Sequence, residues 1–174
     1  LIPGQTYFIR IQGRNLREGT FQICIDNYFP PTEPGSDLEI ASVLCDKSRF
    51  VIQQVIGTGN DNNEARGTCL DIPGSGVTSE QSSTWFTWIA ANDGQLTFTL
   101  DPIKPDDDLD LVVYELPNGL NNTEGKIALR CMATSYEGPT GLDLTSTDLS
   151  EDQGCDFGED GFLQALDMET GKAY

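Results

Sequence analysis

The sequence predicts an all-β protein, an antiparallel β-sandwich of the jelly-roll or CUB-like kind. Three observations support this fold class. Aromatic and β-branched residues recur in short clusters, turn-forming Gly, Pro, Asn and Asp separate the clusters, and apolar and polar residues alternate within several of them. A chain of 174 residues can form one core, because a domain of this size buries about two-thirds of the surface that the unfolded chain exposes.

The first expected strands lie at the N-terminus. Within residues 6–12 the side chains of Tyr7, Ile9 and Ile11 alternate with those of Phe8, Arg10 and Gln12, which is the period of a half-buried strand. Residues 20–25 repeat the alternation after a polar stretch, so residues 1–26 are predicted to contain a hairpin.

A linker and a larger unit are expected to follow the hairpin. Residues 27–36 contain Pro30, Pro31 and Pro34, which cannot donate ladder hydrogen bonds, so this segment is expected to be extended. Residues 37–174 then form the sandwich unit. Its expected strands are residues 49–56, 83–90, 94–100, 110–116 and 126–132.

Two connections within this unit are also predicted. Asn92, Asp93 and Gly94 favour a tight hairpin between residues 83–90 and 94–100, because such residues tolerate a positive φ. Residues 137–160 are mostly Gly, Ser, Thr and acidic residues, so they are expected to form one long loop.

The two ends of the chain share a short pattern. Gly4-Gln5-Thr6-Tyr7 opens the first predicted strand, and Gly171-Lys172-Ala173-Tyr174 closes the chain. This match predicts a tandem array sampled out of phase. Residues 1–26 would be the last hairpin of a preceding or neighbouring unit, and residues 37–174 would lack their own. The hairpin could fold back onto its own unit or complete a neighbour. Because the chain begins at Leu1, it is expected to be a processed product or part of a longer protein.

The charge balance excludes some partners. The chain has 28 acidic and 10 basic residues and a formal charge of −18, so nucleic acids and anionic lipid surfaces would repel it. Bound calcium would relieve the repulsion between carboxylates; alternatively, the charge only keeps a secreted protein in solution. No apolar run approaches the roughly 20 residues of a membrane-spanning helix, and no signal-peptide pattern is present, so a water-soluble piece is expected.

Two oxygen-rich segments are candidate calcium sites. Asp106, Asp108 and Asp110 alternate just before an apolar strand, and a loop there could direct several carboxylates to one ion. The alternative is a solvated acidic turn. Asp61 and Asn63 belong to a second cluster, residues 60–64, whose alternative is a turn in which the side chains bind their own backbone.

Five cysteines are widely spaced and contain no C-x-x-C pair, and the chain has no histidine, which excludes a mixed Cys/His zinc site. Exported β-domains commonly carry disulfides across loops. The predicted pairs are Cys45 with Cys69 and Cys131 with Cys155, which leaves Cys24 over. The alternative is that all five cysteines are reduced core residues.

Trp85 and Trp88 must lie on opposite faces of a strand, because their spacing is odd. One is expected in the core. The other could face outward and stack on a sugar ring, as in a carbohydrate-binding module, or it could pack in the core as well.

The sequence gives no support for catalysis. Without histidine the chain cannot build a Ser-His-Asp or Cys-His arrangement, and the phosphate-binding glycine motifs are missing. Among 28 acidic residues some carboxylate pair is inevitable, so a pair alone does not indicate a glycosidase. We therefore expect a protein that is not an enzyme.

Several segments resemble a known class of repeat. The segments are GQTYFIRIQG, GTFQICI, SVLCDKSRF, STWFTW, GQLTFTL, DDDLDLVVYELPNG and KIALRCMA. Together they resemble the repeat units of very large surface proteins of gliding Bacteroidetes, which are exported by type IX secretion. The chain is more distantly similar to the pre-peptidase C-terminal domain. Leu38 and Thr123 depart from the repeat pattern, in which Cys is frequent at these positions, and this would explain an unpaired Cys24.

The resemblance implies a structural or adhesive unit at the cell surface or outside the cell, linked to gliding motility. Its partners would be neighbouring copies or repeats of itself. The missing hairpin predicts that these copies join head to tail by strand complementation into a filament, and the acidic segments predict that calcium stabilises it. The alternative is a carbohydrate- or ligand-binding accessory module of a secreted enzyme, with surface polysaccharide as a partner. A run of similar units beside this one would support the array, and an adjoining hydrolase would support the module.

Overall fold

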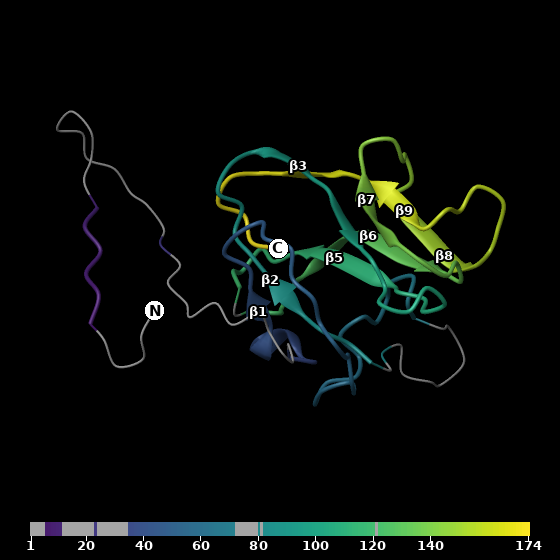
Figure 1. Ribbon diagram of the computed structural model, residues 1–174, viewed down its shortest axis with the longest axis horizontal. Coiled ribbons are helices and arrows are strands. Elements are labelled where there is room, and N and C mark those ends of the chain that lie inside the picture. Colours follow the sequence, from purple (N-terminus) through teal and green to yellow (C-terminus); the bar gives the residue numbers. More distant parts are fainter. Residues whose placement is uncertain (1–5, 12–22, 24–34, 72–79, 81, 121) are drawn as a thin grey trace.

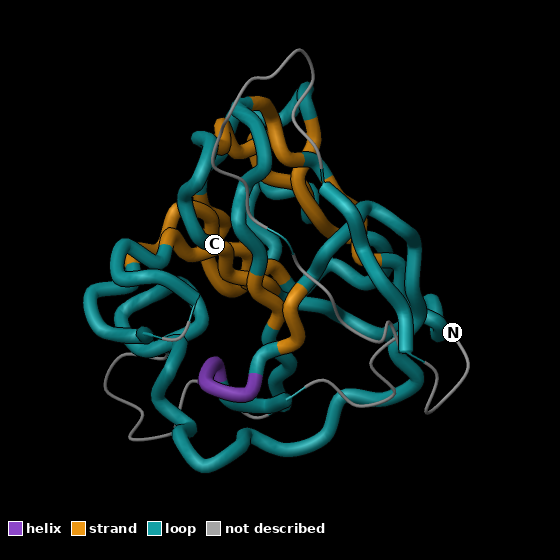
Figure 2. Tube along the Cα trace, turned by 90° about the vertical axis from the view of Figure 1, so that its left-hand side faces the viewer, coloured by secondary structure: helices purple, strands orange, loops and turns teal. Residues whose placement is uncertain are grey.

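The computed structural model describes residues 6–11, 23, 35–71, 80, 82–120 and 122–174. These residues form an all-β fold, as the sequence predicts, with 29% of the described residues in strands. The helical element of the described part is one 3-10 turn, η2 (Leu38–Ile40). In Figure 2 the turn lies at the bottom of the molecule, while the strands gather above it.

One layer is a three-stranded sheet in the order β5-β6-β8. Its strands are β5 (Leu111–Glu115), β6 (Ile127–Thr134) and β8 (Ser150–Gly154). β5 and β6 are antiparallel, and β8 runs parallel to β6 on its other edge. The apolar runs of β5 and β6 bury most of their side chains, so these two predicted strands are confirmed.

The facing layer has the order β4-β7-β9. Its strands are β4 (Phe98–Leu100), β7 (Thr140–Asp143) and β9 (Phe162–Gln164). β7 pairs antiparallel with β4 and parallel with β9. The approach of β4 to β7 requires a glycine, because a Cβ at position 141 would clash with the carbonyl oxygen of Phe98.

Two shorter ladders extend the layers. β3 (Gly94–Leu96) pairs antiparallel with β10 (Leu166–Met168), and β1 (Ser42–Val43) pairs parallel with β2 (Phe86–Thr87). The end of the chain continues past β10 and pairs with the residues that follow β2, through a bridge between Ile89 and Ala173. Figure 1 shows the C-terminus between β2 and β5.

The main core lies between the two layers. Its buried members come from both sheets, from the segment after β2, from β10 and from the chain end: Ala90, Leu111, Val113, Met132, Leu142, Leu163, Leu166 and Tyr174. Burying a side chain the size of leucine contributes about 1.5–3 kcal/mol. A second cluster of Leu38, Tyr114, Leu116 and Ala173 covers the opposite face of β5. The fold is therefore a β-sandwich with an additional apolar layer over one sheet.

A buried arginine ties the two sheets together. Arg130 on β6 donates hydrogen bonds to the carbonyl oxygens of Gln164 (2.7 Å), Ala165 (2.8 Å) and Leu129 (2.6 Å). Gln164 ends β9, Ala165 follows it and Leu129 lies on β6, so the guanidinium binds backbone acceptors of both sheets.

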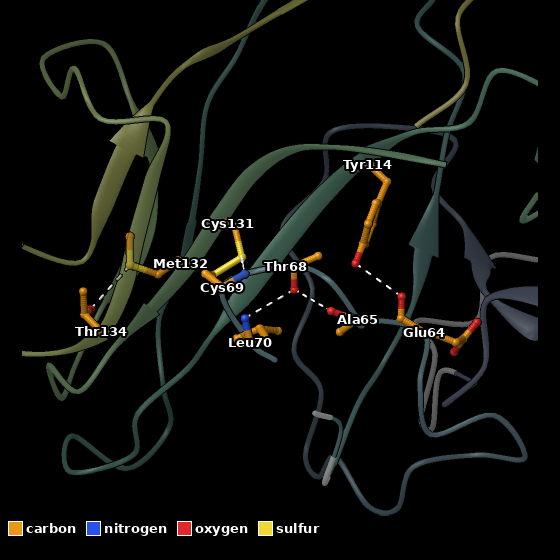
Figure 3. The surroundings of a disulfide bond; sticks show 9 residues. All are labelled: Glu64, Ala65, Thr68, Cys69, Leu70, Tyr114, Cys131, Met132 and Thr134. Carbon is orange, nitrogen blue, oxygen red and sulfur yellow. Dashed lines mark hydrogen bonds between the residues drawn. A yellow bond between two sulfur atoms is a disulfide. The ribbon is translucent and has the colours of Figure 1, made fainter. Parts of the chain in front are cut away.

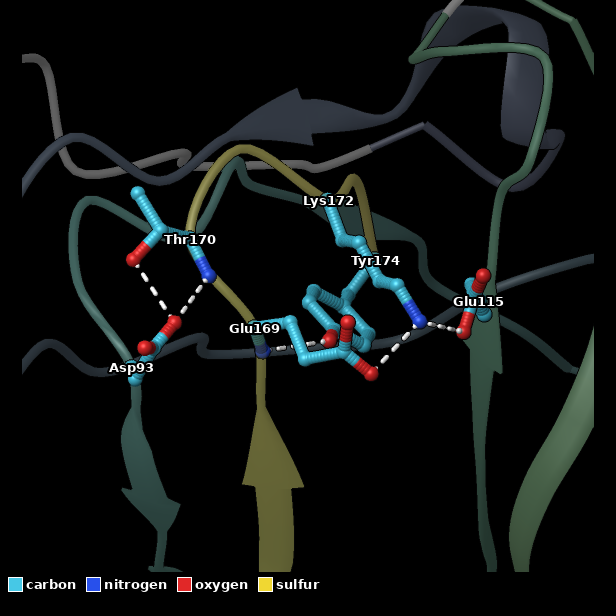
Figure 4. Close-up of polar contacts among 6 residues, drawn as sticks. All are labelled: Asp93, Glu115, Glu169, Thr170, Lys172 and Tyr174. Carbon is cyan, nitrogen blue, oxygen red and sulfur yellow. Dashed lines mark hydrogen bonds and ion pairs between the residues drawn. The ribbon is translucent and has the colours of Figure 1, made fainter.

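The predicted hairpin at Asn92-Asp93-Gly94 is wrong. The backbone of Ala90 forms hydrogen bonds with Gly171 and Lys172, whereas β3 pairs with β10. The two strands that the hairpin would join therefore pair with different parts of the C-terminal segment. The Asp93 carboxylate accepts bonds from the backbone N–H and hydroxyl of Thr170, at 2.6 and 2.7 Å. This fixes the turn to the chain end (Figure 4) instead of closing a hairpin.

Three other expected elements differ from the structure. Residues 49–56 contain no strand, and residues 94–100 divide into β3 and β4. Residues 137–160 are not one loop, because they contain β7 and β8. The polar composition of β7 misled the prediction: Thr140, Gly141 and Leu142 are buried between β4 and β9.

The predicted cysteine pairs are also wrong. Cys69 is bonded to Cys131, with Cα atoms 5.8 Å apart, and Cys155 is a free, exposed cysteine. Figure 3 shows this bridge beside β6. Cys45 is disulfide-bonded too, but not to Cys69. Cys24 lies outside the described residues. Loop 57–71 is thus fixed to β6, where Cys131 also accepts a hydrogen bond from the backbone N–H of Cys69.

The described N-terminal residues lie apart from the sandwich (Figure 1). Their apolar side chains are exposed: Tyr7 50%, Phe8 94%, Ile9 61% and Ile11 52%. The partner strand expected at residues 20–25 and the linker expected at residues 27–36 lie mostly outside the described residues.

Candidate functional site

The acidic segment before β5 does not gather its three aspartates. Within the described ranges, no three or more His, Cys, Asp or Glu side chains form a group that could hold a metal ion. Two of the aspartates do influence each other. Burial and the Asp108 carboxylate raise the pKa of Asp110 to about 6, and burial and Glu137 raise the pKa of Asp108. The segment thus holds two carboxylates in an unfavourable environment for negative charge.

The second oxygen-rich cluster uses its side chains to hold its own loop. The Asp61 carboxylate accepts a hydrogen bond from the backbone N–H of Asn63 at 3.0 Å. The backbone N–H groups of Asn60 and Asp61 donate to the buried carboxylate of Asp37, at 2.6 and 2.9 Å. This arrangement matches a turn in which Asp and Asn side chains bind backbone groups.

Beside this loop the structure buries a carboxylate that the sequence does not single out. Glu64 is 5% exposed, and its Oε1 accepts a hydrogen bond from the backbone N–H of Leu38 at 3.0 Å. Its Oε2 is buried without a hydrogen-bond partner in the described part of the chain. Burial raises the pKa of Glu64 to about 7, and Glu80 contributes to the rise. A negative charge is therefore costly here.

An aromatic pair lies next to Glu64. The rings of Trp85 and Tyr114 stack with centroids 5.7 Å apart, and the Lys126 ammonium lies over both rings, at 5.6 and 5.3 Å. The Tyr114 hydroxyl donates to the carbonyl oxygen of Glu64 at 3.4 Å (Figure 3). Trp85 comes from the segment that leads into β2, and Tyr114 from β5, so their side chains join the two strands.

Both tryptophan side chains pack against a tyrosine ring. Trp85 belongs to the second cluster, and Trp88 stacks on Tyr174 in the main core, with ring centroids 5.8 Å apart. Their placement on opposite faces is confirmed. Neither forms an exposed platform for a sugar ring, because both are half-buried against another aromatic ring.

The last residues of the chain lie between the segment that follows β2 and the end of β5. Trp88 and Tyr174 exchange two backbone hydrogen bonds of 2.9 Å, and the N–H of Leu116 donates to the carbonyl of Ala173 at 2.9 Å. Lys172 forms ion pairs with Glu115 at 3.3 Å and with Glu169 at 2.8 Å (Figure 4). The segment 171–174 therefore contacts the residues that follow β2 and the end of β5.

Comparisons with known proteins give no relative: no family model, curated protein or solved structure matches the chain. In the part of the chain that the structure describes, no helix has the length and apolar character needed to cross a bilayer.

Proposed function

We propose that this chain is a non-enzymatic structural or adhesive repeat unit of an extracellular surface protein, which assembles head to tail by strand complementation. The observation that carries the proposal is the exposure of an alternating apolar segment, Tyr7 to Ile11, apart from the sandwich. Exposed alternating segments of this kind add readily to open sheet edges. An acceptor edge and a donor segment on one chain give a heterologous contact, which can repeat without closing.

The composition agrees with this role. A Cys69–Cys131 disulfide suits an oxidising compartment outside the cell. The chain has no histidine to act as a general base near neutral pH. The domain division of the proposal is residues 1–26 as the donor hairpin, 27–36 as the linker and 37–174 as the acceptor sandwich.

Association of the purified chain tests the proposal. We expect sedimentation velocity to show oligomers that grow with concentration, because each chain carries both donor and acceptor. Removal of residues 1–26 should leave monomers that are less stable and more prone to aggregate. A full-length variant with Ile9→Asp and Ile11→Asp should also be monomeric, because a strand with charges on its apolar face cannot enter a core.

The matched control is Ile103→Asp, since Ile103 is equally exposed, at 62%, but lies on the acidic loop before β5. This variant should associate like the parent chain. A parent chain that stays monomeric at every concentration would contradict the proposed function.

Calcium is the second part of the proposal. It is supported by the raised pKa values of Asp108 and Asp110, because a bound divalent cation would lower both. We expect the melting temperature to rise with calcium concentration relative to chelator, since an ion that binds the folded state stabilises it. Asp108→Asn with Asp110→Asn should remove the rise, whereas the exposed control Asp156→Asn should keep it. Identical melts of the parent chain in both buffers would count against calcium.

A further inference from the structure

A cavity of about 350 Å³ lies between the turn that follows β5 and residues 171–173. Its size is in the range of small-molecule sites, which enclose roughly 300–1,000 Å³. Four apolar residues form most of its wall: Ile89, Leu116, Pro117 and Ala173. The side chain of Tyr174 belongs to the main core and does not line the cavity.

Two glycines keep this space open. Gly119 and Gly171 line the cavity with φ values of 89° and 83°, a conformation that favours glycine. No atom of the described residues lies within 4 Å of a Cβ built on either glycine. Their backbone is fixed, because the N–H of Gly119 donates to the carbonyl of Leu116 at 3.0 Å and that of Gly171 to Ala90 at 2.8 Å. Ordered backbone therefore bounds the cavity on two sides.

Two carboxylates share one ammonium group at this cavity (Figure 4). The Lys172 ammonium lies 2.8 Å from the carboxylate of Glu169 and 3.3 Å from that of Glu115. The side chain of Glu169 is 68% exposed, whereas that of Glu115 is 21% exposed and lines the cavity with Lys172. Two negative charges and one positive charge sum to −1. The half-buried Glu115 thus has only the longer share of one ammonium group.

The walls and the charge together favour an organic cation. An apolar wall cannot supply the six to eight oxygen ligands that calcium takes, and no three His, Cys, Asp or Glu side chains of the described residues form a metal-binding group. An anion would be repelled by Glu115 and by a chain of formal charge −18. A primary ammonium group on a hydrocarbon chain suits both parts, since its chain contacts the apolar wall and its N–H groups donate to the carboxylate.

We propose that this cavity binds a small aliphatic ammonium ion, whose hydrocarbon part lies against the apolar wall and whose ammonium group pairs with Glu115. Lys172 keeps its shorter ion pair with Glu169 when the ligand is bound. The site involves neither residues 1–26 nor the acidic segment before β5, so it is independent of the association and the calcium binding proposed above.

The test is a titration of the full chain with pentylammonium, followed by the amide NMR signals of Leu116 and Ala173. Three further probes separate the contributions: ammonium chloride has the charge without the chain, pentanol has the chain without the charge, and pentanoate has the opposite charge. Glu115→Gln removes the carboxylate, and Lys172→Met removes the competing ammonium group. Glu137→Gln is the matched control, since Glu137 is exposed and lies beyond the other end of β6.

We expect saturable shifts with pentylammonium, weaker binding of pentanol, and none of pentanoate or ammonium chloride. Glu115→Gln should lower the affinity for pentylammonium about tenfold, as expected when one hydrogen bond to a charged group is lost. Lys172→Met should raise the affinity, and Glu137→Gln should leave it unchanged.

Three results would each overturn the inference: no saturable shift with pentylammonium, equal affinity for pentanol and pentylammonium, or an affinity that is unchanged in Glu115→Gln or lowered in Lys172→Met. If a variant does not fold, the comparison of the probes on the parent chain decides alone. None of these results bears on association of the chain, so the proposed function would stand or fall separately.

Discussion

Replacing Cys69 and Cys131 together by alanine should lower the free energy of unfolding by about 4 kcal/mol, as expected for opening a loop of this size. The two residues are 62 positions apart, so their bridge restricts a long segment of the unfolded chain. In the folded protein the bridge also holds loop 57–71, and with it Glu64 and Asp37, against β6. Urea unfolding followed by tryptophan fluorescence measures the change.

Cys155→Ala is the control for this experiment. Cys155 is exposed and free, so its replacement should alter the free energy of unfolding by less than about 0.5 kcal/mol. Peptide mapping without reductant should recover Cys69 linked to Cys131 and Cys155 labelled by alkylation. A double variant as stable as the parent, or a Cys131–Cys155 peptide, would show that the pairing is different.

Glu64→Gln should stabilise the protein above neutral pH and leave it unchanged in acid. The pKa of Glu64 is raised from 4.5 to about 7 in the folded state, so the folded protein binds the proton more tightly than the unfolded chain does. The contribution of Glu64 to the free energy of unfolding is then greatest below pH 4.5, falls as the pH rises from 4.5 to 7, and is constant above 7. Glutamine keeps an oxygen for the Leu38 N–H and removes the charge.

At pH 8 the expected gain is about 1–2 kcal/mol, because solvent near the loop screens part of the roughly 3 kcal/mol that the full pKa shift implies. Glu124→Gln is the matched control: it removes the same charge from an exposed position and should show no such gain. Chemical unfolding from pH 4 to 8 gives the free energy of unfolding against pH for both variants and for the parent. Parallel curves for Glu64→Gln and the parent would refute a buried, titrating Glu64.

The sequence predicts the fold class and the best-patterned strands, but not the pairing. β5 and β6 are recognisable because apolar residues fill them and turn residues bound them. β7 and β8 are not, since their Thr, Gly, Ser and acidic residues are those of loops; burial of Thr140 and Gly141 depends on neighbours about 20 or more residues away in the chain. Local turn chemistry at Asn92-Asp93-Gly94 was likewise overridden, by bonds to Thr170.

The residues of the candidate site also divide into those that the sequence indicates and those that only the fold reveals. The repeated Gly-x-x-Tyr pattern predicts that a hairpin begins at the chain end, and this stays a prediction; in the structure Tyr174 pairs with Trp88 through two backbone hydrogen bonds. Glu64 could not be found, because it is one of 28 acidic residues and only the fold distinguishes its environment. Disulfide connectivity could not be found either, since spacing does not reveal which cysteines become neighbours.

The late position of the core-forming residues has a consequence for biogenesis. Leu163, Leu166 and Tyr174 belong to the main core, and β7 has no parallel neighbour until β9 has been made. A chain that emerges N-terminus first cannot close its sandwich until residues 163–174 have emerged. Synthesis of residues 117–174 takes on the order of seconds. During that interval the chain lacks the residues that complete its main core.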